Sequence, residues 1–115
     1  MKTAVHISYE SVRETLRSIG LPRRYCGFQR TAYAVFFAVQ DEERLTNLGA
    51  LIYPLVAKQC HTSIASIESS IRTLINDYWE HTDEDLLWKV FHRDHDEKPT
   101  VVQFIEELTN YVLPE

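Results

Sequence analysis

Glycine, proline and long apolar runs are scarce in this sequence, and each shortage limits what the protein can be. The 3 glycines and 4 prolines among 115 residues form no linker, low-complexity segment or phosphate-cradling loop. The longest apolar stretches, such as AYAVFFAV at positions 32–39, fall far short of the roughly 20 residues that a membrane span needs. The N-terminus MKTAVHISYE lacks the apolar stretch of a signal peptide. We therefore expect one soluble, cytoplasmic domain spanning residues 1–115.

Cysteine is scarce as well, and its placement argues against the usual cysteine chemistries. Cys26 and Cys60 have neither CxxC spacing nor the density of a disulfide scaffold, so we expect buried thiols. Cys60 and His61 are sequence neighbours, which do not face each other on a helix, so no thiol nucleophile with its base is expected. The segment HRDHDE at 92–97 offers no closed ligand set, and we expect a solvated acidic loop rather than a metal site. We predict no enzymatic activity and no cofactor.

Net positive charge is also absent. The formal net charge of -5 argues against a general nucleic-acid coat protein. The charge is uneven, however, because residues 1–40 carry +4 and the other 75 residues carry -9. The basic part could face phosphate while the acidic part faces solvent or a protein partner. Two solvated faces without such a partner are the alternative, and the charges alone leave it open.

What the sequence does contain is helical periodicity. Apolar residues recur three and four positions apart, and no alternating run is long enough to predict a sheet. We therefore expect an all-α domain of about six helices. The aromatic residues between positions 25 and 37 largely follow helical spacing, which favours core packing over a base-stacking platform. They are Tyr25, Phe28, Tyr33, Phe36 and Phe37.

Capping residues indicate where the first helices begin and end. Ser11 is the predicted N-cap of the first helix, because Glu14 completes a reciprocal S-V-R-E pattern. Gly20 and Pro22 should end this helix, since glycine accepts the left-handed conformation and proline cannot continue the spiral. A second helix is predicted over residues 28–40, ending at the acidic residues 41–43. The predicted buried residues of the two helices are Val12, Leu16, Ile19, Phe28, Ala32, Val35, Phe36 and Val39.

Four further helices follow from similar signals. Pro54 suits the start of a helix over residues 54–60, because its missing N–H would have no partner there. Ser63 is the predicted N-cap of a helix over 64–79, and Thr82 that of a helix from about residue 83. Thr100 and Gln103 form a capping box at the start of the last helix. The predicted apolar contacts of these helices are Ile64, Ile67, Ile71, Leu74, Ile75, Tyr78, Leu87, Trp88, Phe91, Val101, Phe104, Ile105, Leu108 and Val112.

Residues 54–79 also fit the spacing of a helix-turn-helix. In that motif a small residue lies where the two helices approach, and a branched apolar residue follows ten positions later, as do Ala57 and Ile67. Val56 and Cys60 would supply the apolar contacts of the first helix. The turn at 61–63 has the usual length but no glycine. Many antiparallel helix pairs share this pattern, so the spacing alone leaves DNA binding open.

Several motifs in register resemble one known family. They are I-G-x-P at 19–22, Y-P-x-x-A-K at 53–58, T-x-x-x-x-x-E-x-x-I-R at 62–72, Trp79, and K-P-T-x-x-x-F-I at 98–105. In this order they are similar to the C-terminal DNA-binding effector domain of the sporulation master regulator, the sporulation stage-zero protein A family, over roughly residues 11–112. The resemblance implies a response-regulator output module that reads a short DNA box. Full-length members carry an N-terminal receiver domain, which is not seen here, so a stand-alone effector and a piece of a longer regulator both remain open.

The resemblance also implies a DNA-reading helix. In the family this helix resembles R-V-E-R-A-I-R, and the same register here reads S-I-E-S-S-I-R at 66–72. The implied base-reading residues are Ser66, Glu68, Ser69 and Arg72. Arginine presents two donors to guanine and serine only one short hydroxyl, so each replacement forfeits about 1–3 kcal/mol of base discrimination. Arg72 lies four residues after Glu68 and can compensate its charge, although an ordinary surface ion pair is the alternative.

Phosphate contacts are expected at the periphery of this helix. The predicted set is Lys58, Thr62, Ser63, Arg23, Arg24 and Arg30. A reading face with so few cations predicts weaker binding and a shallower salt dependence than in a more basic relative. The expected partner is double-stranded DNA, with a second copy of the domain and RNA polymerase as further candidates, and no membrane. The rival interpretation is a protein-interaction module that kept the fold and lost DNA recognition.

Overall fold

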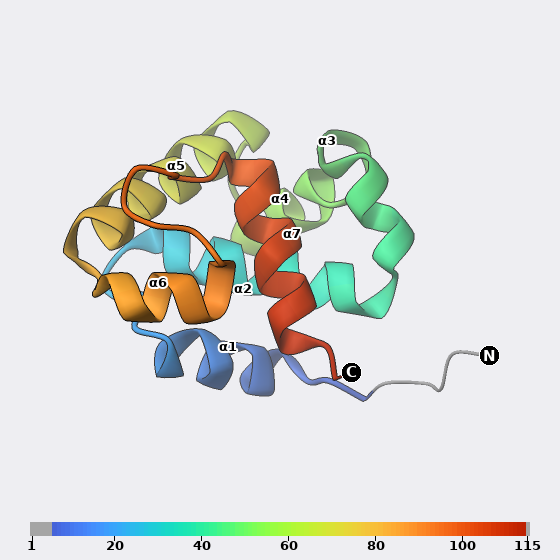
Figure 1. Cartoon of the computed structure of the whole chain (residues 1–115). Coiled ribbons are helices and arrows are strands. Elements are labelled where there is room, and N and C mark those ends of the chain that lie inside the picture. Colours follow the sequence, from blue (N-terminus) through green and yellow to red (C-terminus); the bar gives the residue numbers. More distant parts are fainter. Residues whose placement is uncertain (1–5, 115) are drawn as a thin grey trace.

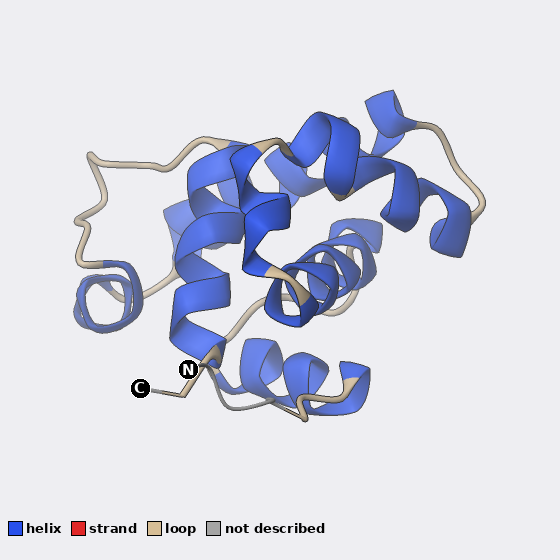
Figure 2. Ribbon diagram, turned by 90° about the vertical axis from the view of Figure 1, so that its right-hand side faces the viewer, coloured by secondary structure: helices blue, strands red, loops and turns tan. Residues whose placement is uncertain are grey.

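The computed structural model describes residues 6–114 of the chain (Figure 1). Within that range lie six α-helices of at least eight residues, a single-turn helix, one 3-10 helix and no strand (Figure 2). Their bounds are α1 Tyr9–Ser18, α2 Cys26–Gln40, η1 Glu42–Thr46, α3 Leu48–Leu51, α4 Tyr53–Cys60, α5 Ile64–His81, α6 Glu84–Phe91 and α7 Val101–Val112. The predicted all-α class is therefore confirmed. Residues 1–5, the first half of the N-terminal stretch that lacks the apolar run of a signal peptide, lie outside the described range.

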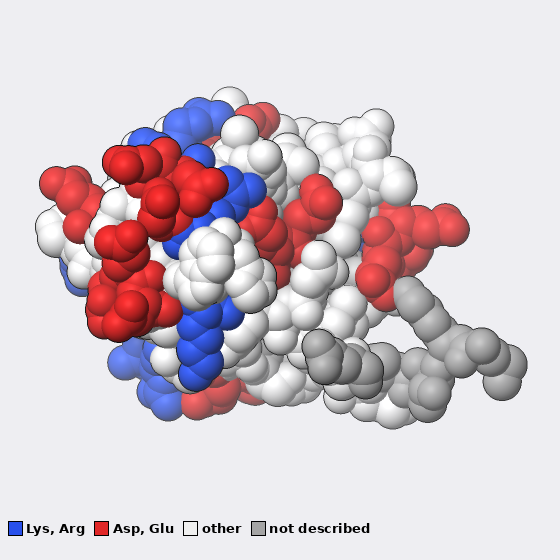
Figure 3. All heavy atoms as spheres, viewed as in Figure 1, with Lys and Arg blue, Asp and Glu red and all other residues white. Residues whose placement is uncertain are grey.

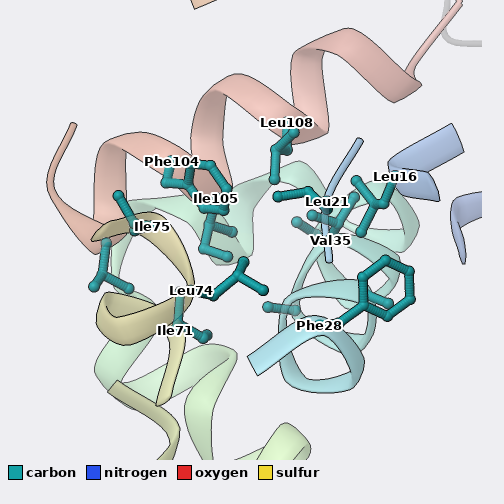
Figure 4. Packing of buried hydrophobic residues seen from close by; sticks show 14 of the residues in the cluster. Leu16, Leu21, Phe28, Val35, Ile71, Leu74, Ile75, Phe104, Ile105 and Leu108 are labelled. Carbon is teal, nitrogen blue, oxygen red and sulfur yellow. The ribbon is translucent and has the colours of Figure 1, made fainter. Parts of the chain in front are cut away.

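Helix α2 is the centre of this fold. It packs against α1, α4, α5 and α7, and the buried side chains of these helices form one apolar cluster. Figure 4 shows side chains of four helices converging, among them Leu16, Val35, Leu74 and Ile105. No helix in the described part of the chain is both long and apolar enough to span a bilayer. The arrangement holds α5 against α2 along one side and leaves its opposite side open.

Several predicted helix ends are confirmed. The Ser63 hydroxyl oxygen accepts a hydrogen bond from the Ser66 N–H at 3.1 Å, which caps α5. Thr100 and Gln103 form the reciprocal capping box at the start of α7. Gly20, in the left-handed region at φ 88°, follows the last residues of α1 and turns the chain toward α2. These ends follow from local chemistry that the sequence alone displays.

The predicted N-cap of α1 is wrong. The helix begins at Tyr9, and the Ser8 hydroxyl oxygen accepts from the Ser11 N–H at 3.0 Å, so Ser11 lies inside the helix. The earlier start places the Tyr9 ring on the Tyr33 ring of α2, with centroids 4.1 Å apart. Such aromatic stacking adds stability beyond simple burial. The contact between Tyr9 and Tyr33 therefore favours the helix start at Tyr9, with Ser8 rather than Ser11 as the N-cap.

The predicted cap of α6 is wrong as well. The Asp83 carboxylate accepts from the Asp85 N–H at 3.2 Å and is the N-cap of this helix. Thr82 is instead the C-cap of α5, which continues to His81, two residues past its predicted end. A carboxylate at this position is also favoured by the positive end of the helix dipole.

Four predicted buried side chains are partly or largely exposed. Ile64 is 40% exposed in the first turn of α5, and Trp88 is 58% exposed on α6. Phe36 and Val112 are half-buried against the core. The other residues of the predicted buried helix faces are buried, whereas Tyr25, Tyr33 and Phe37, also predicted for core packing, are half-buried against the core. The buried-thiol prediction is wrong for Cys26, which is exposed because α2 begins there, while Cys60 is half-buried and both thiols are free.

Candidate nucleic-acid interface

The helices α4 and α5 form the predicted helix-turn-helix. Val56 of α4 and Ile67 of α5 are completely buried. The turn between them uses His61 in the left-handed conformation at φ 53°, where glycine is the usual residue. The Thr62 N–H donates to the Ala57 carbonyl at 3.0 Å and closes the end of α4. The spacing seen in the sequence therefore corresponds to a real turn, formed without glycine.

The side of α5 that faces away from the core carries an exposed stripe. Its members follow the helical period and are Ala65, Ser69, Arg72, Thr73, Asn76 and Glu80. Ser69 lies at the centre of this stripe, opposite the buried residues. Thr73 and Asn76 were not predicted as site residues from the sequence, although they follow Ser69 by four and seven positions and so lie on the same side of the helix. The two remaining predicted readers, Ser66 and Glu68, are half-buried on opposite flanks of the stripe.

The flank toward α4, here called the α4 flank, carries Glu68 and Arg72. The Arg72 Nη2 lies 3.6 Å from the Glu68 Oε2, and the side chains are 60% and 45% exposed. The predicted ion pair is thus confirmed. Both charges act on Tyr53 of α4, whose pKa is raised to about 12 mainly by burial and further by Glu68, while Arg72 opposes the rise. The pair is therefore a solvent-facing feature next to the start of α4.

The flank toward α2, here called the α2 flank, carries Ser66 and Ser70 together with Arg30 of α2. The Arg30 Nη1 donates to the Ser70 hydroxyl at 2.8 Å and to the Ser66 carbonyl at 3.2 Å. Burial raises the pKa of the nearby Cys60 thiol, and the charge of Arg30 opposes that rise. A raised pKa is the reverse of what a nucleophilic thiol needs. The Arg30 side chain, from α2, is thus held against α5 and near Cys60 at the end of α4.

Gly27 brings α2 and α5 this close together. A Cβ atom at this position would lie 2.4 Å from the Ser70 carbonyl oxygen and 3.1 Å from the Leu74 Cβ. Because the first of these is a backbone atom, it cannot move without shifting α5. Gly27 therefore fixes the approach of the two helices, a role for which the sequence contains no local signal.

An open recess of about 470 Å³ lies between the start of α2 and the outer side of α5. Ser66 and Ser69 share this recess with Arg30, so three of the predicted site residues are brought together. Their neighbours there are mostly small or hydroxyl-bearing. The complete lining is Tyr25, Cys26, Gly27, Arg30, Ala65, Ser66, Ser69, Ser70 and Thr73.

The other residues predicted to contact phosphate are spread along α5. Lys58, Thr62 and Ser63 lie around its N-terminus, where Lys58 and Ser63 are exposed. Arg24 lies much farther along, with its Nη2 3.5 Å from the Asp77 Oδ2. Asp77 follows Ser66 by eleven residues, which corresponds to about 16 Å of helix. Arg23 is exposed beside Arg24. The structure thus does not gather this set at one point.

Acidic side chains gather over α6 and the loop that leads to α7, near the C-terminal end of α5 (Figure 3). The loop residues are tied into the fold, because the Arg93 Nη2 lies 2.7 Å from the Glu107 Oε2 and the Trp79 indole N–H donates to the Asp94 carbonyl at 3.0 Å. Within residues 6–114 no three potential metal ligands cluster. The loop thus serves to join α6 and α7 to the second half of α5.

The comparison with known families agrees with this arrangement. The family described as "Sporulation initiation factor Spo0A C terminal" matches residues 12–112. The match runs from α1 to the last residue of α7 and includes every residue predicted to contact bases or phosphates.

Proposed function

Because the chain belongs to the Spo0A C-terminal family, whose members are DNA-binding regulatory domains rather than enzymes, we propose that it is a sequence-specific transcriptional regulator acting in the cytoplasm, with an altered or weakened DNA preference. The observation that supports this best is the exposed stripe of α5, which belongs to a helix-turn-helix and is open to solvent on its outer side, as a helix that enters a major groove must be. We also propose that the described helices make up one effector domain, since they share one core.

The proposed readers of base edges are Ser66, Glu68, Ser69 and Arg72. Arg72 is the strongest of them, because a guanidinium can donate two hydrogen bonds to a guanine. Glu68 can accept from a cytosine amino group once its pairing with Arg72 loosens. The two serines supply single hydroxyls, and Ser69 is the better placed because it lies at the centre of the stripe.

Phosphate contacts are proposed for Lys58, Thr62, Ser63, Arg23 and Arg24, whereas Arg30, the sixth residue predicted from the sequence to contact phosphate, is hydrogen-bonded to α5. The first three surround the N-terminus of α5, whose free N–H groups and dipole also favour an anion. Fewer cations release fewer counterions, so we expect a shallow dependence of affinity on salt. We also propose that a second copy of the domain binds next to the first on DNA, and that RNA polymerase is a further partner.

A protein-interaction role is the rival proposal, and one observation favours it. The acidic side chains over α6 and its following loop would repel DNA and could instead face a basic protein (Figure 3). This surface lies at the other end of α5 from Lys58, so it leaves the N-terminal half of the reading helix free for a groove.

A gel shift at low salt separates the two roles. The full chain would be titrated against a duplex that contains the DNA box of the family and against a scrambled duplex. We expect tighter binding of the box, and affinities measured at several salt concentrations should give a shallow slope. Failure to bind either duplex would favour the rival role, and a slope as steep as that of a strongly basic repressor would contradict the weak electrostatic contribution.

A further inference from the structure

Arg30 occupies a position that a simple phosphate contact does not explain. Resting on the proposed function, we propose that Arg30 is a specificity-determining residue, which reads a base edge from α2 beside positions 66 and 69, where α5 has only serine. Its guanidinium is bonded to the reading helix itself, 36 and 40 positions away in the sequence. The reading surface would then be built from two helices.

The anchoring of Arg30 leaves a defined edge of the guanidinium free. Its Nη1 carries two hydrogens, and the Ser70 hydroxyl and the Ser66 carbonyl accept both. The Nη2 and Nε make no hydrogen bond with the residues that the structure describes. These two nitrogens present parallel donors, which match the O6 and N7 acceptors of guanine. Because the two hydrogen bonds at Nη1 already hold the side chain in place, little conformational entropy is lost when the free edge binds a base.

The location of this edge favours a base over a phosphate. Arg30 shares the recess with Ser69, which lies at the centre of the exposed stripe of α5, whereas a phosphate contact is expected at the rim of the groove. Arg24 offers the contrast, because it is 71% exposed and pairs with Asp77 near the far end of α5. The close approach at Gly27 keeps Arg30 within reach of the groove when α5 enters it.

The test compares base discrimination in matched variants of the full chain. A preferred duplex is first selected with the wild-type protein, and affinities are then measured for every single base-pair change. Arg30→Lys keeps the charge and loses the two-donor edge, so we expect about a 5- to 100-fold loss of discrimination at one base pair with little loss of non-specific affinity. Ser70→Ala removes one anchor and should reduce discrimination at the same base pair by less. Arg17→Lys, in an exposed pair with Glu14 on α1, should change nothing.

Each other outcome overturns part of the proposal. An unchanged preference in Arg30→Lys, with a specific wild type, would overturn the role of Arg30 and leave the proposed function intact. An equal loss on all duplexes would assign Arg30 to phosphate contact or to folding, and thermal unfolding of the variant separates those two causes. A wild-type protein that selects no duplex at all would overturn the proposed function and the role of Arg30 with it.

Discussion

The two flanks of α5 hold their cations in different ways. On the α4 flank, Arg72 and its partner Glu68 belong to the same helix, and both are partly open to solvent. On the α2 flank, the cation is Arg30 of another helix, held by two hydrogen bonds across the helix interface. The composition of a reading helix therefore understates the charge that its surface presents, because a neighbouring helix can supply it.

The energetic consequences of the two arrangements differ. An exposed pair four residues apart contributes only about 0.3–0.5 kcal/mol, so Arg72 can leave Glu68 for DNA at little cost. A hydrogen bond to a charged group contributes about 1.5–3 kcal/mol when partly buried, so Arg30 is held in place before DNA arrives. The α4 flank should thus adapt to DNA, while the α2 flank should bind as a preformed surface.

The largest expected effect, on both stability and DNA binding, comes from forcing α2 and α5 apart at the α2 flank. Gly27→Ala places a methyl group against the Ser70 carbonyl, so α2 and α5 must move apart. Overpacking of this kind typically costs about 1–3 kcal/mol of unfolding free energy, and DNA binding should fall with it. Urea unfolding and a gel shift measure both quantities.

Gly49→Ala is the matched control for that variant. A methyl group at Gly49 meets only the Asn47 Oδ1, at an ordinary 3.7 Å. Alanine is also the better helix former, so this variant should be neutral or slightly more stable. Equal destabilisation by the two substitutions would contradict the role given to the Gly27 contact.

The next effect concerns the α4 flank. Arg72→Ala should remove about 1–3 kcal/mol of discrimination near one base pair, because a two-donor contact with guanine is lost. Stability should change little, since the side chain is 60% exposed and its ion pair is weak. Affinities for single base-pair variants of the preferred duplex provide the measurement. Unchanged affinity and specificity would remove Arg72 from the site.

The smallest effect is expected at Lys58, which belongs to neither flank of α5. Lys58→Gln removes an exposed cation at the end of α4 without disturbing the core. Binding should weaken to a similar degree on all duplexes, and the slope of log K against log salt should become shallower by about 0.9 for the one lost phosphate contact. A loss confined to one base pair would instead indicate that Lys58 reads sequence.

Most of the fold could be predicted because its signals are local. The cap at Ser63, the box at Thr100 and the stop at Gly20 each depend on residues within one turn of helix. The wrong caps, Ser11 and Thr82, had a competing residue nearby that tertiary packing or a stronger acceptor favoured. Ile64 and Trp88 fit the apolar period, but no neighbouring helix covers them.

The site was harder to predict than the fold. The family resemblance and the pairing of Glu68 with Arg72 are confirmed, since they rest on motifs and on a four-residue spacing. The hydrogen bond from Arg30 to Ser70 joins residues 40 positions apart. The close approach at Gly27 depends on how α2 packs against α5. Neither leaves a periodic pattern in the sequence, so only the packed structure shows them. The roles of these residues on DNA stay predictions.

Selection from random duplexes tests the central claim most directly. The wild-type protein and a Ser66→Arg, Ser69→Arg double variant would each be used to enrich binding sites at the same salt concentration. We predict that the wild type enriches one short motif, and that the double variant binds more tightly and prefers different base pairs opposite the two substituted positions. No enrichment by the wild type, or the same motif from both proteins, would contradict DNA reading by this face of α5.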